Sequence, residues 1–484
     1  MTERLRPEDM AFLVTEAASS PMHNATLEIF EPGGGFDYDR LVALVADRIA
    51  FVPRYRQRLR SVPGRLANPV WVDDEDFDLT YHVRRSALPR PGSMDQLRDL
   101  TARIMSRQLD RHRPLWEMYL IEGVEHDRFA ILSKSHQILV DGVATIDLGQ
   151  VILDVDPHPK DTVHDDWHPR HTPSQSALVA GAVRDSVRDP RLAVTTLAEN
   201  AGSVVRTMGA VGGRLAEVAG TLANRRATPE TPISTRLSEQ RRFVTVKTSL
   251  EDYRRVRRFH GGTVNDVILA TLTGAIRAWL MTRAESVDSG RRIKALVPMS
   301  VIDSDLEPTS LGSQVAGMLL SLPVGEASPV VRLHQVSYAL KAHKETGRAV
   351  AADRLTGVAG FAPTTFHALG SRLAAASLRR GFDLTVTNVP GPQFPLYAAG
   401  AQMTESYPVQ PLLPHHALAI GVTSYDGGVY FGLNGDRDAL PDLDVLGQCV
   451  TEALEELVDT VSSSRQRAPR GRGRTGRTPQ EPTR

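Results

Sequence analysis

Hydrophobic residues in the first third of the chain recur at two spacings, one typical of strands and the other of helices. Ala25 to Phe30 is a strand-like run, and apolar residues at helical spacing follow between Asp39 and Ile49. A second helical stripe lies between Leu97 and Met105, and Met118 to Ile121 again has the pattern of a strand. Strands and helices in this mixture predict an α/β (α+β) domain over residues 1–153.

The same mixture returns after residue 240 and predicts a second domain over residues 241–461. The expected strands lie at 243–247, 293–297, 382–386, 417–424 and 429–433, and the longer helices at 267–281 and 443–457. Thr263 and Asp266 have the spacing of a capping box and should begin the helix at 267–281. Pro298 should end the strand at 293–297, and Asp426-Gly427 should form a hairpin turn.

Between the two domains the composition changes. We expect a crossover linker with weak helices over residues 154–240. Its first part, 156–173, contains four histidines and four aspartates, which could ligate an ion such as zinc. The same part contains four prolines and no apolar framework, which favours a mobile connection, so we predict no metal site.

The stretch from Arg128 to Ile146 joins a strand to a helix through a polar segment. Phe129 to Leu132 is strand-like, and Asp141-Gly142 turns the chain into a helical pattern. His136, at the end of the strand, could act as a proton acceptor held by the nearby carboxylate. The alternative is that these polar residues only satisfy backbone groups.

Four arginines alternate with other residues in P-R-Y-R-Q-R-L-R, at positions 54, 56, 58 and 60. If this run were extended, the four guanidiniums would share one face and attract a phosphorylated ligand. A solvated basic face is the alternative that we favour.

Composition excludes several classes of protein. The 484 residues are 41% hydrophobic and 24% charged, which is ordinary for a globular protein. The single cysteine, Cys449, excludes an internal disulfide and a multi-thiolate metal site. The first residues lack the apolar region of a signal peptide, and no run approaches the ~18 apolar residues of a membrane span. We therefore expect a cytoplasmic protein.

Charge is distributed unevenly along the chain. The whole chain has a formal net charge of zero, which gives no reason to expect nucleic-acid binding. We expect a disordered tail over residues 462–484, in which 465–484 contain seven arginines and one acid. This excess could bring the tail to an anionic lipid or nucleic acid, or only keep it in solution.

Several uncommon strings occur in an order that resembles the bacterial wax ester synthase/diacylglycerol acyltransferase family. They are L-R-P-E-D-M-A-F-L (5–13), P-M-H (21–23), V-P-R-Y-R-Q-R-L (52–59), F-D-L-T-Y-H-V (77–83), L-P-R-P-G (88–92), L-D-R-H-R-P-L-W-E (109–117), T-V-N-D-V-I-L-A (263–270), V-P-M-S-V (297–301), T-N-V-P-G-P (387–392) and S-Y-D-G-G-V-Y-F-G-L (424–433). The resemblance extends from residue 5 to about residue 460.

The resemblance implies two chloramphenicol-acetyltransferase-like domains, joined by the crossover and meeting along a tunnel. It also implies acyl-CoA as the acyl donor and no cofactor. The acceptor would be diacylglycerol or a long-chain alcohol, and the product triacylglycerol or wax ester. Substrates with long apolar chains agree with peripheral contact to the inner membrane or to lipid droplets.

This chain departs from the family motif H-H-x-x-x-D-G at one position. Alignment on Asp141-Gly142 places the first histidine at His136 and the second at Gln137. The second is the family's general base, which takes the proton of the acceptor hydroxyl. A glutamine amide cannot accept that proton, and losing a general base typically costs about 10²–10⁴-fold in rate. If the strand continues to this point, His136 faces away from Gln137 and is a poor replacement.

The resemblance assigns roles to other residues. Asp141 is expected to support the local geometry, and Gly142 to permit the tight turn. Pro114, Leu115 and Trp116 match a motif that implies packing at the tunnel wall, beside the substrate.

Two further pairs match or lie near the family's strings. Asn265 and Asp266 match a motif at a helix start, for which a helix cap is a sufficient explanation. His415-His416 is a second candidate base, which we interpret as a polar loop end.

These observations lead to hypotheses from different classes. The first is a CoA-dependent lipid O-acyltransferase, slowed by Gln137. The second is a catalytically silent relative that binds lipids or a partner protein. A condensation enzyme acting on carrier-bound acyl groups has the same motif, but the stand-alone chain and the set of strings argue against it.

Overall fold

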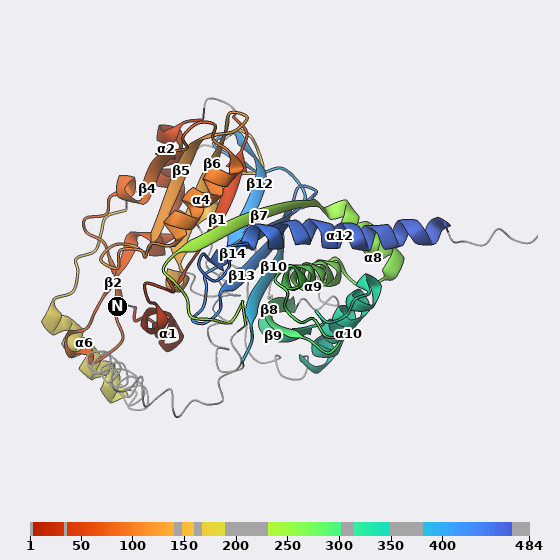
Figure 1. Ribbon diagram of the computed structural model, residues 1–484. Helices are drawn as coiled ribbons and strands as arrows, with labels where there is room; N and C mark the ends of the chain where they lie inside the picture. Colours follow the sequence, from red (N-terminus) through yellow and green to blue (C-terminus); the bar gives the residue numbers. More distant parts are fainter. Residues whose placement is uncertain are drawn as a thin grey trace, which may run out of the picture.

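The computed structural model describes residues 3–32, 36–139, 148–158, 167–188, 231–301, 314–347 and 381–466. These residues form two six-stranded sheets, each with its own helices (Figure 1). The fold is therefore of the predicted mixed α/β class, in two sheet-and-helix units.

The first sheet has the strand order β11-β12-β1-β6-β5-β4. Its strands are β1 (His23–Phe30), β4 (Val83–Ala87), β5 (Trp116–Val124), β6 (Arg128–His136), β11 (Tyr397–Ala398) and β12 (Ala401–Val409). Helices of the first half are α1 (Pro7–Thr15), α2 (Tyr38–Arg48), α3 (Leu79–His82), α4 (Met94–Met105), α5 (Leu148–Val151) and α6 (Gln175–Arg188), and a small ribbon pairs β2 (Gln57–Arg60) with β3 (Val70–Asp73).

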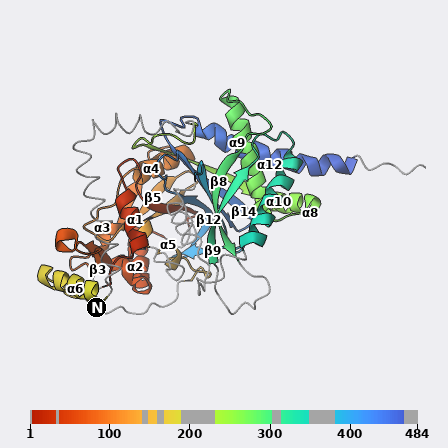
Figure 2. The same cartoon turned by 90° about the horizontal axis from the view of Figure 1, so that it is seen from below.

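The second sheet has the order β7-β14-β13-β10-β8-β9. Its strands are β7 (Arg241–Ser249), β8 (Ile293–Val301), β9 (Gln314–Leu322), β10 (Leu384–Pro390), β13 (Leu418–Tyr425) and β14 (Gly428–Asp436). The helices α8 (Leu250–His260), α9 (Val264–Thr282), α10 (Pro329–Gly347) and α12 (Leu443–Gln466) gather beside this sheet, whereas α1 to α5 lie with the first (Figure 2).

The second half of the chain completes the first sheet. Strand β12 pairs antiparallel with β1, from Ala25 opposite Val409 to Phe30 opposite Met403. The core of the first unit accordingly contains Leu396 and Tyr407. The predicted domain at 241–461 thus gives residues 397–409 to the sheet of the domain at 1–153.

Local signals in the second half are mostly confirmed. Thr263 and Asp266 form the predicted capping box at the start of α9. Asp426 and Gly427, both with positive φ, form the turn between β13 and β14. The expected strand end at Pro298 is wrong, because β8 runs on to Val301. Proline has no backbone N–H to donate to a neighbouring strand. Strand β10 pairs with β8 at Ala295 and Leu296, before Pro298, and β9 continues to pair with β8 beyond it.

Helix α9 is the one helix within the described ranges that is long and apolar enough to cross a membrane. Most of it is buried inside the second unit, from Val267 to Leu280, as expected for a core helix. Its length and composition alone are therefore weak grounds for a membrane span.

Candidate active site

The candidate site lies where β6 ends. The strand stops at His136, and Gln137–Leu139 form a single 3-10 turn, η4. The Gln137 backbone N–H donates to the Met22 carbonyl at 3.0 Å, which ties this turn to the residue before β1. The Gln137 side chain is fully buried, and neither atom of its amide bonds to a described residue. Asp141 and Gly142, the other predicted motif residues, lie outside the described residues.

His136 is not placed to act as a base. Its Nδ1 accepts the Ile138 backbone N–H at 3.2 Å, so this lone pair is already used. Its Nε2 faces Glu16 Oε2 at 3.6 Å, and only 1% of the side chain is exposed. His136 therefore braces the turn, and these contacts do not support our first interpretation of it as the proton acceptor.

Glu16 is a buried carboxylate that sequence reasoning missed. It accepts the Met22 N–H at 3.1 Å and is bonded by Arg111. Burial opposes ionisation of Glu16, but the hydrogen bonds and charges of His136 and Arg111 outweigh it and hold the pKa of Glu16 well below its usual value. The sequence gives only a weak signal for Glu16: it is a single acid between an apolar helix and the small residues that follow.

A lysine and a histidine of the same sheet hold the end of α4. Lys134 donates to the carbonyls of Ile104 and Arg107, at 3.0 and 2.6 Å, and His23 Nε2 donates to the Met105 carbonyl at 2.8 Å. Donors at this position satisfy the last carbonyls of a helix and suit its dipole. Burial lowers the pKa of Lys134 to about 8.

Pro114, Leu115 and Trp116 lie beneath the turn. The Leu115 carbonyl accepts the His136 N–H at 2.9 Å, and Trp116 pairs with Ser135 on the adjoining strand. Trp116 is 2% exposed and donates from Nε1 to the Tyr55 carbonyl at 2.7 Å. All three residues are buried and support the β5–β6 edge of the site.

His82 stacks on this tryptophan and leads to a pH prediction. Its ring lies 4.6 Å from Trp116, Nδ1 donates to the Trp116 carbonyl, and burial lowers its pKa from 6.5 to about 4. Between pH 6.5 and 4 the unfolded chain binds a proton here that the folded chain does not, so the folded state loses about 3 kcal/mol as the pH falls.

Urea unfolding at a series of pH values measures this loss. His82→Gln should flatten the fall in unfolding free energy between pH 6.5 and 4, although His23, whose pKa is also lowered by burial, keeps part of it. A slope equal to that of wild type would contradict the assignment to His82.

Asn265 and Asp266 lie at the start of α9 in the second unit. Asp266 accepts from Thr263 in the capping box and from Ser337 Oγ of α10 at 2.8 Å. Asn265 Oδ1 accepts from Asn388 Nδ2 at 2.7 Å. The contacts of Asp266 with described residues are thus structural, which agrees with the helix-cap interpretation.

We expect Asp266→Ala to lower the free energy of unfolding by about 1–2 kcal/mol, because it removes the cap. At a temperature where both proteins stay folded, the rate of ester formation should not change. A loss of rate without a loss of stability would instead place Asp266 at the substrate.

Other candidates from the sequence have structural partners. Both ring nitrogens of His416 contact carbonyls, of Pro414 at 2.7 Å and of Phe382 at 3.0 Å, so this pair ends a loop as expected. The arginine run is broken between a 3-10 turn and β2, and neither a phosphate-binding face nor a solvated one forms. Arg54 lies over Trp71, Arg56 lies over Trp167, and Arg58 pairs with Asp74.

The described part of 156–173 has no cluster of three or more metal ligands. His158 pairs with Asp156, and His171 with Glu75. His164, Asp161, Asp165 and Asp166 lie outside the described residues.

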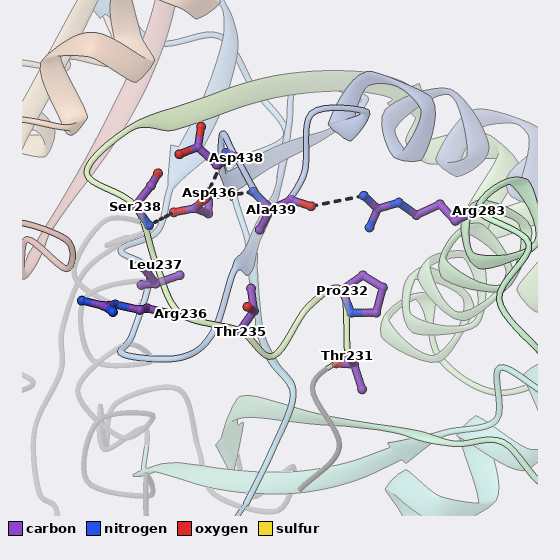
Figure 3. A pocket seen from close by; sticks show the side chains of 10 residues that line it. All are labelled: Thr231, Pro232, Thr235, Arg236, Leu237, Ser238, Arg283, Asp436, Asp438 and Ala439. Atoms are coloured by element: carbon purple, nitrogen blue, oxygen red, sulfur yellow. Dashed lines mark hydrogen bonds between the residues drawn. The ribbon is translucent and has the colours of Figure 1, made fainter. Parts of the chain in front are cut away.

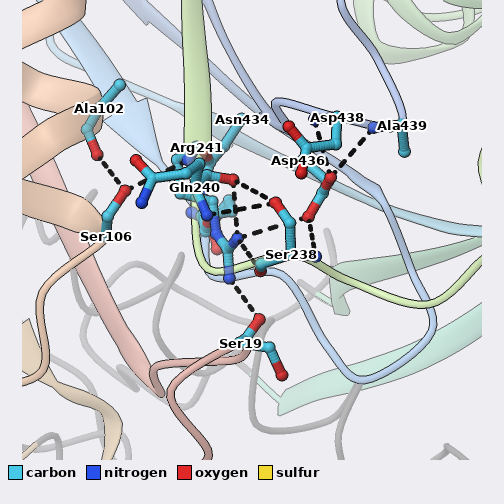
Figure 4. Close-up of polar contacts among 11 residues, drawn as sticks. Ser19, Ala102, Ser106, Ser238, Gln240, Arg241, Asn434, Asp436, Asp438 and Ala439 are labelled. Carbon is cyan, nitrogen blue, oxygen red and sulfur yellow. Dashed lines mark hydrogen bonds and ion pairs between the residues drawn. The ribbon is translucent and has the colours of Figure 1, made fainter.

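The arginine of a buried ion pair in the second unit connects the two units beside the site (Figure 4). Arg241, at the start of β7, lies 3.6 Å from Asp436, and the two side chains are 2% and 1% exposed. Arg241 also donates to the Ser19 carbonyl, and its backbone N–H donates to Ser106 Oγ, both in the first unit. Ser19 lies between Glu16 and Met22, so the second unit holds the loop that contacts His136 and Gln137.

A hollow of about 590 Å³ lies next to this pair (Figure 3). Its lining is Thr231, Pro232, Thr235, Arg236, Leu237, Ser238, Arg283, Asp436, Asp438 and Ala439. Asp436 already accepts the Ser238, Asp438 and Ala439 N–H groups. Arg283 pairs with Asp442 at 3.1 Å. We therefore assign no ligand to this hollow.

Known structures define the class of this fold. The first condensation domain of the CDA synthetase superimposes with a TM-score of 0.53 at 14% identity, covering 95% of this chain and 97% of that one. The wax ester synthase/diacylglycerol acyltransferase of Marinobacter aquaeolei VT8 superimposes with a TM-score of 0.65 at 27% identity, covering 95% of this chain and 100% of that one. The fold is that of acyltransferases with two chloramphenicol-acetyltransferase-like units.

Sequence comparisons identify the family. Residues 5–268 match the wax ester synthase/diacylglycerol acyltransferase catalytic domain, and 311–458 match the C-terminal domain of the same family. The probable diacylglycerol O-acyltransferase tgs1 of Mycobacterium tuberculosis H37Rv is 35% identical over 442 residues, 90% of this chain and 91% of its own length. The probable diacylglycerol O-acyltransferase tgs3 of the same strain is 42% identical over 265 residues, 53% of this chain and 96% of its own length. The chain belongs to the wax ester synthase/diacylglycerol acyltransferase family and is an acyltransferase.

Proposed function

We propose that this protein transfers an acyl group from acyl-CoA to the hydroxyl of diacylglycerol or a long-chain alcohol. The acceptor oxygen attacks the thioester carbonyl, the C–S bond breaks, and the hydroxyl proton leaves with the CoA thiolate as the free thiol. The products are triacylglycerol or wax ester, and CoA. The observation that carries this proposal is the match to both domains of the family, over residues 5–268 and 311–458.

Gln137 fits binding of the acceptor better than removal of its proton. Its amide offers both a donor and an acceptor, so it can hold a hydroxyl near the thioester. It cannot take the proton, because an amide stays neutral at physiological pH. Positioning of the substrates then supplies the rate enhancement that remains.

Purified protein tests this with labelled acyl-CoA and either diacylglycerol or hexadecanol. Neutral lipid above a no-enzyme control supports the proposal. Absence of product with acyl chains of several lengths would reject it.

A second candidate is a catalytically silent relative that binds lipids or a partner protein. Two observations favour it. Gln137 has no basic atom, and His136 is buried, with Nδ1 accepting from Ile138 and Nε2 facing Glu16. Such a protein should bind acyl-CoA or acceptor without turnover, which equilibrium binding alongside the assay would reveal.

We also propose that the protein works in the cytoplasm, at the surface of the inner membrane or of lipid droplets. Both proposed acceptors partition into lipid, so an enzyme that uses them has to reach that phase. The arginine excess after residue 465 supports attraction to anionic lipid.

A further inference from the structure

A cavity of about 200 Å³ lies against the first sheet, where the two halves of the chain meet. Residues 150–155 of the first half and 391–396 of the second half enclose it. The two segments are joined, because Asp154 and Tyr397 exchange both backbone hydrogen bonds at 2.8 Å. Its lining is Thr26, Glu28, Gln150, Leu153, Val155, Gly391, Pro392, Phe394, Leu396, Met403, Ser406, Thr423, Ser424 and Tyr425.

The wall formed by the second half is rigid. The Tyr425 hydroxyl accepts the Leu396 N–H at 2.8 Å and donates to the Met403 carbonyl at 2.9 Å. A Cβ at Gly391 would come within 2.0 Å of the Ser424 carbonyl oxygen, so only glycine permits this close approach. The cavity is thus part of the folded structure.

The floor of the cavity is polar, although it is buried. Thr26 and Glu28 come from β1, and Ser406, which pairs with Glu28, comes from β12. The same sheet face continues to Ser133, which pairs with Thr26, and to Asn24. Thr26 Oγ1, Ser133 Oγ and Asn24 Oδ1 are all buried without a bond to any described residue. Buried polar atoms cost free energy unless something bonds them, which indicates a polar ligand or water along this face.

This row of polar atoms leads to the candidate site. Ser133 lies three residues before the end of β6 at His136, a distance of about 10 Å along the strand, and Gln137 follows in η4. Gln137 follows Ser135 by two residues, directly after the strand ends, and its amide is also unbonded among the described residues. One end of the polar row therefore lies beside the candidate site, and the other lies at the cavity.

The open end of the cavity is apolar and exposed. Val155 is 66% exposed and Phe394 is 49% exposed, although both are large hydrophobic side chains. Phe51, 60% exposed, ends the turn that packs on α5, beside the Arg48–Asp154 pair. Exposed apolar side chains around a cavity are typical of a surface that contacts lipid or a partner.

We propose that this cavity is the entrance for the hydroxylic acceptor, taken directly from a lipid surface. The rim, defined as Val155 and Phe394, contacts the lipid phase. The hydroxyl end of the acceptor enters at Thr26 and is directed along the polar face of β1, past Asn24, to Gln137. This inference rests on the proposed acyl transfer and adds the route and the source of the acceptor.

The rim is tested with Val155→Asp combined with Phe394→Asp. Diacylglycerol is presented in phosphatidylcholine vesicles, octanol is presented in solution, and acyl-CoA is the donor in both assays. We expect a loss of about tenfold in kcat/KM for the vesicle substrate, because carboxylates replace two side chains that bury apolar area at the interface. Turnover of dissolved octanol should remain. Tyr338→Asp is the matched control, since Tyr338 is 77% exposed on α10, and it should behave as wild type.

The floor is tested with Thr26→Val, which keeps the shape and removes only the hydroxyl. Because Thr26 Oγ1 has no described partner, the folded protein should lose no stability, whereas KM for both acceptors should rise about two- to tenfold. KM for acyl-CoA should not change. A purely structural role of Thr26 would give the opposite result, with lower stability and unchanged KM.

The outcomes separate this inference from the proposed function. Equal effects of the rim variant and Tyr338→Asp, or equal losses with both acceptors, would overturn the inference while the acyl transfer stands. If wild type forms no ester, the proposed function fails, and flotation with vesicles then tests whether the rim contacts lipid. Weaker flotation of the rim variant, with Tyr338→Asp floating as wild type, would support the lipid contact. Equal flotation of all three proteins would overturn the lipid contact as well.

Discussion

Gln137→His should raise kcat for ester formation by about 10²–10⁴-fold, because it restores a general base where β6 ends. The histidine would replace an amide that bonds no described residue, so no hydrogen bond to a described residue is lost. It would also give the enzyme a pH profile, with activity falling below about pH 6.5 as the imidazole becomes protonated. Initial rates with labelled acyl-CoA and hexadecanol, from pH 5 to 9, measure both effects.

Gln137→Asn is the control for this experiment, because it changes the shape of the site without adding a base. It should not gain activity. A wild-type enzyme as fast as Gln137→His would defeat the silent alternative. A histidine variant that stays inactive would indicate that the silent chain has lost more than its base.

The second large effect concerns stability. Arg241→Met should lower the free energy of unfolding by about 3–5 kcal/mol, since it leaves Asp436 charged, buried and without its cation. It also removes the hydrogen bond to the Ser19 carbonyl, and with it the link between the second unit and the loop that holds the Gln137 turn. Urea unfolding measures the loss of stability. The effect of losing the contact with Ser19 is measured as kcat at urea concentrations where the variant is still folded.

The neighbouring residue offers a matched comparison. Arg242 pairs with Asp444 at the surface, where the two side chains are 38% and 54% exposed. Arg242→Met should therefore change the unfolding free energy by no more than about 1 kcal/mol. Similar losses for both substitutions would refute the assignment of Arg241 as a buried brace.

Helix caps and turns, which depend on residues adjacent in the sequence, could be predicted from the sequence. The Thr263–Asp266 cap and the Asp426-Gly427 turn depend on backbone conformations that a few adjacent residues determine. The alternation of strands and helices was likewise sufficient for the fold class. Alignment on the family strings assigns Gln137 to the base position, although it does not reveal that β6 ends at His136.

The remaining features depend on residues that are distant in sequence. Glu16 acquires meaning only when Arg111 and His136 surround it, and Arg241 only when Asp436 and Ser19 do. The arginine run at 54–60 was misjudged because the partners of its arginines, Trp71, Asp74 and Trp167, lie on other segments. Such pairings come from tertiary packing, which no periodicity records.

The strand that the second half gives to the first sheet has a consequence for biosynthesis. During translation the edge of β1 stays unpaired until residues 401–409 leave the ribosome, when most of the chain has already been made. Exposed strand edges invite pairing with other chains, and contacts so distant in sequence form slowly. A nascent or truncated first half should therefore depend on chaperones, and splitting the gene near residue 240 should yield fragments that are soluble only when co-expressed.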